Sequence, residues 1–309
     1  MKKVIIDVDT GVDDAWAIMF ALNSPELQIV AITTVAGNVE LDLTTKNTLR
    51  ILGLMKADNI PVGRGIDRPL LRPLKTGKIA HGDDGLGNVG VPETTRKEST
   101  QHGVDMIIDT IMKNPGEITL IPVGPLTNVA VAFLKEPSIA EKVKEVIIMG
   151  GAVAVPGNIT PAAEFNISTD PEAAKIVFSS GMPITLVGLD VTRKTLMRSA
   201  HIEKLASLGT PAGDFVSRSA KIYFDFSKRR FGLDGCALHD PLTVGIAVDR
   251  SLVKTEKHYV DVEVSGDITR GKTLADVYGT RGKEENMEVC LEVDAERFVD
   301  MFVQRISDS

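Results

Sequence analysis

The segment VIIDVDTGVDDAWAIMF, residues 4–20, carries four aspartates within eight positions, at the junction of two apolar runs. The first run, residues 4–6, is β-branched and short, which predicts a buried strand, whereas residues 15–22 have the apolar spacing of a helix. Side chains alternate along a strand, so Asp7 and Asp9 are expected on one face of it, at its carboxyl end. A buried strand that leads directly into a buried helix indicates an α/β fold.

The same alternation of strand and helix continues along the chain. Such a pattern favours an open, mostly parallel sheet flanked by helices on both faces. Since no repeat, low-complexity tract or clear linker interrupts it, we expect a single domain over residues 1–309. Further strands are predicted at residues 27–35, 61–62, 118–123, 146–149, 184–187, 258–264 and 288–293, further helices at residues 41–55, 104–112, 128–134, 171–178 and 294–306, a helical region at residues 200–235, and a long functional loop at residues 64–100.

Charge and composition exclude several classes of partner. The net charge is -7, and the densest basic cluster is only three residues long, at positions 228–230, so we expect no nucleic-acid partner. Cys236 and Cys290 stand in no zinc-binding spacing, and two isolated thiols fit a reducing compartment, although a single disulfide stays open. The N-terminus lacks the features of a signal peptide, and no apolar run reaches the length of a membrane span. We therefore expect a soluble cytoplasmic protein with no membrane partner.

The four aspartates need a chemical explanation beyond helix capping. Asp13 or Asp14 could cap the helix and complement its dipole, but capping does not account for Asp7 and Asp9. At about 4 Å, one like-charge pair costs about 4 kcal/mol at an effective dielectric of about 20. Carboxylate oxygens favour a hard cation, Mg²⁺ or Ca²⁺, which would remove this repulsion. A calcium-binding EF-hand loop is excluded, because Ile18 stands where that loop needs a bidentate glutamate.

Further segments combine polar side chains with turn residues. They are VAGN at residues 35–38, HGDDGLG at residues 81–87, GNITPAAEFNISTDPEAA at residues 157–174 and HDP at residues 239–241. Asp170 and Pro171 have the pattern of a helix cap and first turn, which leaves Glu164 and Asn166 unexplained by capping. Taken singly, each segment is as compatible with a turn or a cap as with a functional site.

Taken together and in order, these motifs resemble the nucleoside hydrolases of the inosine–uridine preferring type. The resemblance implies an open, mostly parallel Rossmann-like sheet, a homodimer or homotetramer, and hydrolysis of the N-glycosidic bond of ribonucleosides to ribose and free base. The motifs that carry it are DVDTGVDDAWA (7–17), AGN (36–38), HGDDG (81–85), GPLTN (124–128), MGG (149–151), GNITPAAEFN (157–166), DPEAA (170–174) and HDP (239–241).

The resemblance also implies a Ca²⁺ ion at the floor of the pocket. Asp9, Asp14 and Asp240 match its carboxylate ligands, and the backbone carbonyl of Val123 matches a fourth ligand. Asp9 matches the general base, which takes a proton from a water held by the ion. Attack of that water in a single displacement would invert the anomeric carbon. Asp7 is expected to support this group from behind.

The resemblance also implies a pocket for the nucleoside, formed by further residues that match the family motifs. Asp13, Asn38, Asn158, Glu164 and Asn166 match residues that bind the ribose hydroxyls, whose fixed donors and acceptors suit amides and carboxylates.

The base side of that pocket is implied by fewer positions. His239 matches a general acid for the leaving base, above all for purines, because its ordinary pKa lies near neutrality. His81 matches a loop histidine near the base, and Tyr223 is the candidate in residues 221–232, where the family carries a mobile helix with base-contacting tyrosines. Purine-specific relatives sandwich the base between tryptophans. The sole tryptophan here, Trp16, is expected in the core, which favours a pyrimidine or broad inosine–uridine preference.

Two other functions compete with this interpretation. The strand followed by DVD also resembles the first motif of haloacid-dehalogenase-type phosphatases, which predicts an Mg²⁺-dependent phosphohydrolase that releases inorganic phosphate. A non-enzymatic nucleoside- or Ca²⁺-binding protein would require the loss of a catalytic residue. The presence of Asp9, Asp14, Asn166 and the pair His239–Asp240 argues against that loss.

Overall fold

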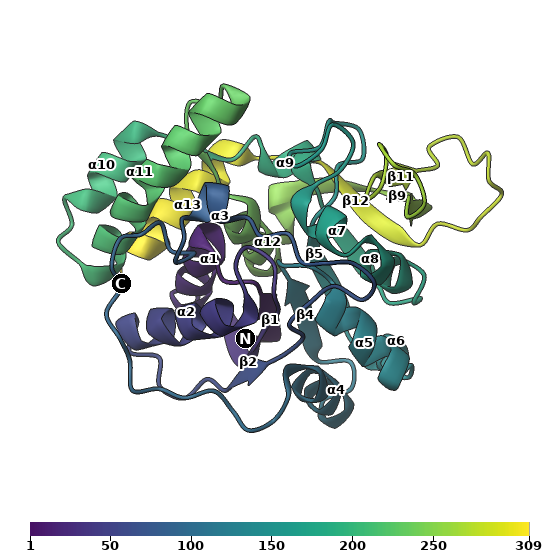
Figure 1. The fold of residues 1–309 in the computed structure, drawn as a ribbon, viewed down its shortest axis with the longest axis horizontal. Coiled ribbons are helices and arrows are strands. Elements are labelled where there is room, and N and C mark those ends of the chain that lie inside the picture. The colour runs from purple at the N-terminus through teal and green to yellow at the C-terminus, as the bar shows by residue number, and fades with distance from the viewer. Residues whose placement is uncertain (309) are drawn as a thin grey trace.

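The computed structural model describes residues 1–308, and an eight-stranded sheet forms its centre (Figure 1). The strand order is β3-β2-β1-β4-β5-β6-β12-β9, and every neighbouring pair is parallel except β12 and β9 at one edge. The strands are β1 (Lys2–Val8), β2 (Leu27–Thr34), β3 (Val62–Arg64), β4 (Ile118–Pro122), β5 (Glu145–Met149), β6 (Ile184–Val187), β9 (Val253–His258) and β12 (Met287–Val293). The predicted α/β fold with a mostly parallel sheet is confirmed.

The first six strands of this order follow the Rossmann arrangement, in which the chain changes direction between β1 and β4. Ligands of such sheets bind beyond the carboxyl ends of the strands at this switch point. The acidic segment follows β1 directly, so it lies at the switch point. The sheet draws its strands from residues 2–293.

Helices cover both faces of the sheet (Figure 1). On one face lie α1 (Val12–Leu22), α2 (Leu41–Leu54), α9 (Leu189–Thr192), α10 (Ser199–Ala206), α11 (Pro211–Phe231), α12 (His239–Val248) and α13 (Ala295–Ser307). On the other lie α4 (Gly103–Lys113), α5 (Thr127–Lys135), α6 (Ile139–Lys142), α7 (Phe165–Thr169) and α8 (Pro171–Phe178). Trp16 is fully buried in the first layer, as predicted for a core residue.

The predicted long loop is confirmed. Between β3 and α4 the chain forms only the short helix α3 (Lys78–His81), which carries His81 to the switch point. The predicted helical region at residues 200–235 is two helices, α10 and α11, because Thr210 caps a new helix by accepting the Gly213 N–H. Short pairings outside the main sheet involve β7 (Leu196–Met197) with β8 (Cys236–Ala237), and a 3₁₀ turn (Arg250–Leu252) precedes β9.

The strand predicted over residues 258–264 is shorter than expected and lies outside the main sheet. β9 ends at His258, and the chain then leaves the main sheet to form β10 (Val260–Val262), which pairs antiparallel with β11 (Thr273–Ala275). The side chain of Asn286 accepts the Val260 N–H at 2.8 Å and donates to the Val260 carbonyl at 3.0 Å. Both backbone groups of Val260 are therefore satisfied without a strand partner in the main sheet, which lets the chain turn away.

Cys236 and Cys290 are both buried and free, so the structure forms no disulfide between them. Within residues 1–308, no helix combines the length and the apolar composition that crossing a bilayer would need.

Candidate active site

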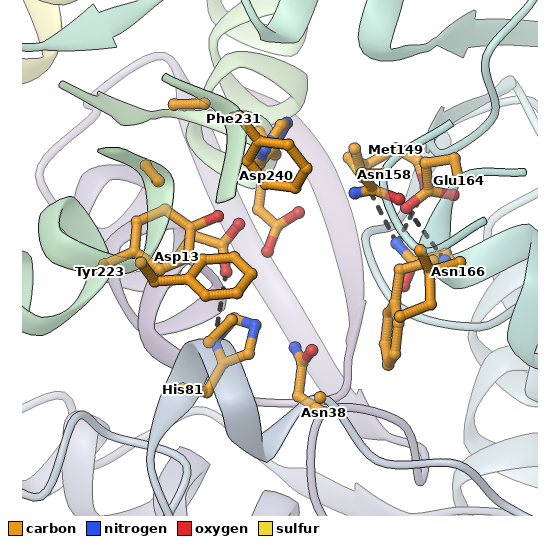
Figure 2. A pocket seen from close by; sticks show the side chains of 18 of the residues that line it. Asp13, Asn38, His81, Met149, Asn158, Glu164, Asn166, Tyr223, Phe231 and Asp240 are labelled. Atoms are coloured by element: carbon orange, nitrogen blue, oxygen red, sulfur yellow. Dashed lines mark hydrogen bonds and ion pairs between the residues drawn. The ribbon is translucent and has the colours of Figure 1, made fainter. Parts of the chain in front are cut away.

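A pocket opens at the switch point, where the ends of β1, β2, β4 and β5 meet the start of α12 (Figure 2). Figure 2 shows Asp13, His81, Tyr223 and Asp240 on one side, and Asn158, Glu164 and Asn166 on the other. The pocket is lined by most of the residues that the sequence singled out, namely Asp13, Asn38, His81, Val123, Asn158, Glu164, Asn166, Tyr223, His239 and Asp240. Asp9 and Asp14 are buried just behind this lining.

Asp9 and Asp14 are held by backbone N–H groups at the end of β1. Asp14 accepts hydrogen bonds from the N–H of Asp9 at 3.1 Å and from the N–H of Gly11 at 2.9 Å. Asp9 Oδ2 accepts the N–H of Asn38 at 2.7 Å, and Asn38 Nδ2 donates to Asp14 Oδ2 at 3.0 Å. The loop after β2 thus fixes both carboxylates that follow β1.

Gly11 makes this close approach possible. A Cβ at this position would lie 2.5 Å from Nδ1 of His81 and 2.8 Å from Nδ2 of Asn38. Real Cβ contacts do not reach such distances, so any larger residue would displace the histidine or the asparagine.

Asp240 joins the aspartates from the far end of the chain. It lies in the first turn of α12, and its carboxylate comes within 4.8 Å of ligand oxygens of Asp13 and Asp14. These three form the acidic group that could hold a metal ion. Burial, followed by repulsion from Asp13 and Asp14, raises the pKa of Asp240 well above its ordinary value. The geometry brings together two of the expected carboxylate ligands, and Asp13 rather than Asp9 completes the closest group.

The environment of Asp9 fits a nearby cation nonetheless. Its Oδ1 is buried and has no hydrogen-bond partner among the described residues. A Cβ at Gly124 would lie 2.7 Å from this oxygen, so only a glycine leaves it room. Burial and the charge of Asp14 raise the pKa of Asp9 well above its ordinary value, and burial also raises that of Asp14. An unsatisfied buried carboxylate oxygen beside further carboxylates is the donor set that a hard divalent ion takes.

Asp7 supports the strand end from behind. Its Oδ1 accepts hydrogen bonds from Thr33 Oγ1 at 2.6 Å and from Asn128 Nδ2 at 2.8 Å. Asn128 also accepts the N–H of Ile66 at 2.9 Å, which ties the start of the long loop to β1. Burial raises the pKa of Asp7 to about 7.

On the opposite wall, Asn166 and Glu164 are fixed by the backbone. Asn166 Nδ2 donates to the carbonyl of Val123 at 2.7 Å, so this carbonyl already accepts one hydrogen bond. Glu164 accepts from the N–H groups of Asn166 at 2.9 Å, Gly151 at 3.0 Å and Ile167 at 3.2 Å. Glu164 therefore is the N-cap of the short helix α7. The expectation that capping does not explain Glu164 was wrong, because α7 precedes the predicted helix and was not foreseen. Asp170 caps α8 as predicted.

His81 is neutral at pH 7 in this site. Burial lowers the pKa of its imidazole to about 4. Its Nδ1 accepts the N–H of Val12 at 3.1 Å, so the ring proton belongs on Nε2. Nδ1 also lies 3.8 Å from Oδ1 of Asp13 (Figure 2), but a neutral Nδ1 that already accepts a hydrogen bond forms no ion pair.

His239 lies beside the acidic group, at the start of α12. Its Nδ1 lies 2.7 Å from Oγ1 of Thr192, which orients the ring. Burial, with the nearby Arg193 cation, lowers the pKa of His239 to about 3. The ordinary histidine pKa that suggested a general acid therefore does not apply inside this pocket.

Aromatic rings of α11 form part of the pocket wall beside His81. The Tyr223 ring lies 5.7 Å from those of His81 and Trp16, the latter in an edge-on arrangement. Further along α11, the ring of Phe226 packs edge-on against that of Phe231 at 5.7 Å. On the other wall, Oδ1 of Asn158 is buried without a hydrogen-bond partner among the described residues.

Several lining residues were not foreseen. In residues 221–232 only Tyr223 was expected to contact the substrate, whereas Phe226 and Phe231 of the same range also line the pocket. Arg193 follows the short helix α9, and no motif marks it. The unforeseen lining residues with large side chains are Ile79, Met149, Ile159, Phe165, Arg193, Phe226, Phe231 and Leu233.

Comparison with known proteins gives concordant results. The family model for inosine-uridine preferring nucleoside hydrolases matches residues 4–300. The pyrimidine-specific ribonucleoside hydrolase RihA of Salmonella arizonae is 40% identical over 304 residues, 98% of this chain and 97% of that protein. A purine-preferring ribonucleoside hydrolase from Gardnerella vaginalis has a similar structure, with 38% identity, a TM-score of 0.95 and coverage of 99% of this chain and 98% of its own. A plant nucleoside hydrolase, the PpNRh1 enzyme, gives 38% identity and a TM-score of 0.95 over 100% of this chain and 99% of its own.

Proposed function

This chain belongs to the inosine–uridine preferring nucleoside hydrolases, and we propose that it prefers pyrimidine ribonucleosides or has a broad inosine–uridine preference. As a member of this family it is an N-glycosidase of ribonucleosides. The observation that supports hydrolysis of ribonucleosides is the pocket at the switch point, with an acidic group at one wall and buried amides at the other. The alternative of a phosphohydrolase finds no support among these relatives.

Two observations bear on the preferred base: the names of the similar enzymes and the position of Trp16. The RihA relative is named as pyrimidine-specific, whereas the similar enzyme from Gardnerella vaginalis is named as purine-preferring, so overall similarity supports neither alone. Trp16 is fully buried against Tyr223 and does not line the pocket, so it is not available to stack on a base. The family's tryptophan sandwich for purines therefore has no counterpart here, which supports the pyrimidine or broad preference.

We propose Ca²⁺ as the cofactor, with Asp9, Asp14, Asp240 and the Val123 carbonyl as its protein ligands. The orphan Oδ1 of Asp9 and the close approach of Asp14 and Asp240 support this set. When bound, the ion would supply Lewis-acid polarisation of the attacking water. Asp13 lies close enough to be an additional or alternative ligand, although the resemblance assigns it to the ribose.

The chain's own residues would then divide the chemistry. Asp9 would accept the proton of the attacking water, since the Asn38 N–H orients its carboxylate at Oδ2 and leaves Oδ1 without a protein partner. Asp13, Asn38, Asn158, Glu164 and Asn166 would bind the ribose hydroxyls. The buried, unpartnered Oδ1 of Asn158 supports this assignment, because a hydroxyl would satisfy it.

The base would lie towards His81, Tyr223 and His239. Both imidazoles are neutral at pH 7, so each would donate a hydrogen bond to the base from a neutral ring. For His239 to protonate a departing purine, its neutral ring would first have to gain a proton, either from the substrate or through it. Water attack from the opposite face would invert the anomeric carbon.

We further propose that the protein is cytoplasmic and that it is a homodimer or homotetramer, the assembly that the family resemblance implies. Sedimentation equilibrium of the purified chain tests the assembly, and a monomer at micromolar concentration would contradict it.

The decisive experiment measures reducing sugar released from inosine, adenosine, guanosine, uridine and cytidine, with and without chelator. We expect ribose release from uridine and cytidine, with or without inosine, and loss of that activity on chelation. Release from adenosine and guanosine alone would contradict the proposed preference, and undiminished turnover in chelator would contradict the proposed ion.

A further inference from the structure

Arg193 joins two walls of the pocket that are distant in sequence. It follows α9 and lines the pocket mouth. Its guanidinium donates to the carbonyl of Pro156 at 3.0 Å and to the carbonyl of Gly157 at 2.8 Å. The same guanidinium lies 5.5 Å from the centre of the Phe231 ring, at the end of α11. One side chain thus connects the loop that carries Asn158 to the aromatic wall.

The first part of the loop of residues 151–158 is held by side chains, whereas the N–H groups of Gly157 and Asn158 donate to the carbonyls of Pro161 at 3.1 Å and Ala163 at 3.2 Å. Asp190 accepts the N–H groups of Val153 at 2.9 Å and Ala154 at 2.7 Å, and Thr273 accepts that of Ala152 at 2.9 Å. Lys272, which does not line the pocket, donates to the carbonyls of Ala152 and Val153. Arg193 binds the pocket end of this loop, at the carbonyls of Pro156 and Gly157. A segment held by side chains rather than by a strand ladder responds locally to the loss of one of them.

Among the described residues that line the pocket, Arg193 is also the one with a permanent positive charge, and the acidic side chains there are Asp13, Glu164 and Asp240. Its planar fork suits this position, because it can donate to two adjacent carbonyls and still lie against an aromatic face. A lysine ammonium at the same place is a point charge with no planar face. The contacts of Arg193 therefore require an arginine, beyond a positive charge.

We infer that Arg193 is a positioning residue that sets the width of the pocket mouth, by holding the loop of residues 151–158 against Phe231 at the end of α11. The inference rests on the proposed function, in which Asn158 binds the ribose and the aromatic wall faces the base. Loss of these contacts would let the two walls separate, so the substrate would be held less tightly before and during the reaction. Such a change weakens the binding of substrate and transition state equally, so it raises KM and leaves kcat nearly unchanged.

The kinetic test compares Arg193→Gln with Arg193→Lys and with Arg230→Gln, using uridine and inosine. Arg230 is exposed in the last turn of α11 and next to Phe231, so its substitution removes the same charge without the contacts. We expect Arg193→Gln to raise KM about tenfold, the loss of a charge-assisted hydrogen bond, with kcat within about threefold. Arg193→Lys should recover part of that loss, and Arg230→Gln should behave like the parent enzyme.

A double-mutant cycle tests the link to the aromatic wall. Phe231→Leu and Arg193→Gln should each raise KM, and the double variant should raise it by less than the product of the two factors. Lys272→Gln loosens the same loop at Ala152 and Val153, so its effect should multiply with that of Phe231→Leu. A multiplicative result for Arg193 and Phe231 would overturn the inference, as would a fall in kcat at constant KM.

Hydrogen exchange of the free enzyme gives a readout that needs no substrate. We expect the amides of Gly157 and Asn158 to exchange about tenfold faster in Arg193→Gln, with no change in Arg230→Gln. Unchanged exchange at these amides would overturn the inference. If the parent enzyme releases no ribose but exchange still accelerates, the proposed function fails while the positioning role of Arg193 stands.

Discussion

The N–H of Asn38 donates a 2.7 Å hydrogen bond to Oδ2 of Asp9, so the loop after β2 holds a carboxylate that follows β1. Because the two strands are parallel neighbours, their carboxyl ends meet at one edge of the sheet. The bond engages one oxygen of Asp9 and leaves Oδ1 buried and without a partner. This asymmetry is what a general base requires: one oxygen that orients the group and one that accepts a proton.

Asp9→Asn is expected to lower kcat for every nucleoside by on the order of a thousandfold, the range for loss of a general base. The isosteric amide keeps an oxygen for the Asn38 N–H but cannot accept a proton at neutral pH. Ribose release at saturating substrate measures the effect, with Asp67→Asn, an exposed loop aspartate, as the matched control. A variant that retains most of the turnover would refute the assignment of the base.

Calcium binding separates the roles of Asp9 and Asp13. Titration calorimetry with Ca²⁺ alone should show a larger loss of affinity for Asp9→Asn and Asp240→Asn than for Asp13→Asn, whereas Asp13→Asn should mainly raise the KM for uridine. A larger loss for Asp13→Asn would instead favour the closest geometric group, Asp13, Asp14 and Asp240. In either case Ca²⁺ should raise the melting temperature, since it binds the folded state only.

His239→Ala should reduce the turnover of inosine more than that of uridine, because a purine depends more on assistance to the leaving base. Because burial lowers the pKa of His239 to about 3, its own titration should add no step to the uridine rate between pH 5 and 8. The measurement is kcat for both substrates across this range. Equal loss on both substrates would count against a purine-directed role.

The titration of Asp7 predicts how stability changes with pH in chelator. Its folded pKa of about 7 lies above the ordinary 3.8, so its contribution is complete below about pH 4 and is lost as the pH rises through 7. The variant Asp7→Asn stays neutral and lacks this loss. Relative to Asp7→Asn, the parent protein should therefore lose on the order of a few kcal/mol between pH 4 and 8. Urea unfolding at each pH measures it, and parallel curves for the two proteins would contradict the expectation.

Much of the fold could be predicted because its signals are local. Apolar strands alternate with amphipathic helices, and the parallel sheet follows from that alternation. The strand predicted over residues 258–264 is shorter and lies outside the main sheet, because both backbone groups of Val260 bond to Asn286, the residue just before β12. A period-two pattern predicts an extended chain, but it does not specify which partner the strand takes.

In the candidate site, too, some residues could be predicted from local sequence signals and others could not. Asp9, Asp14 and Asn38 follow directly from the ends of successive strands, so the sequence places them together. Glu164 was misjudged, because α7 is a single short turn whose cap cannot be recognised without its three N–H partners. Arg193 carried no signal at all, since both of its partners belong to segments distant in sequence.

The amino-acid sequence by itself determined the class of the fold, the switch-point position of the aspartates and the family, because these depend on short-range patterns and motif order. Only the tertiary structure decided that Asp13 lies in the closest acidic group with Asp14 and Asp240, that His81 and His239 are neutral, and that Arg193 joins two walls of the pocket. The physical reason is that desolvation and repulsion depend on which atoms surround a group. For this pocket, those atoms come from both ends of the chain.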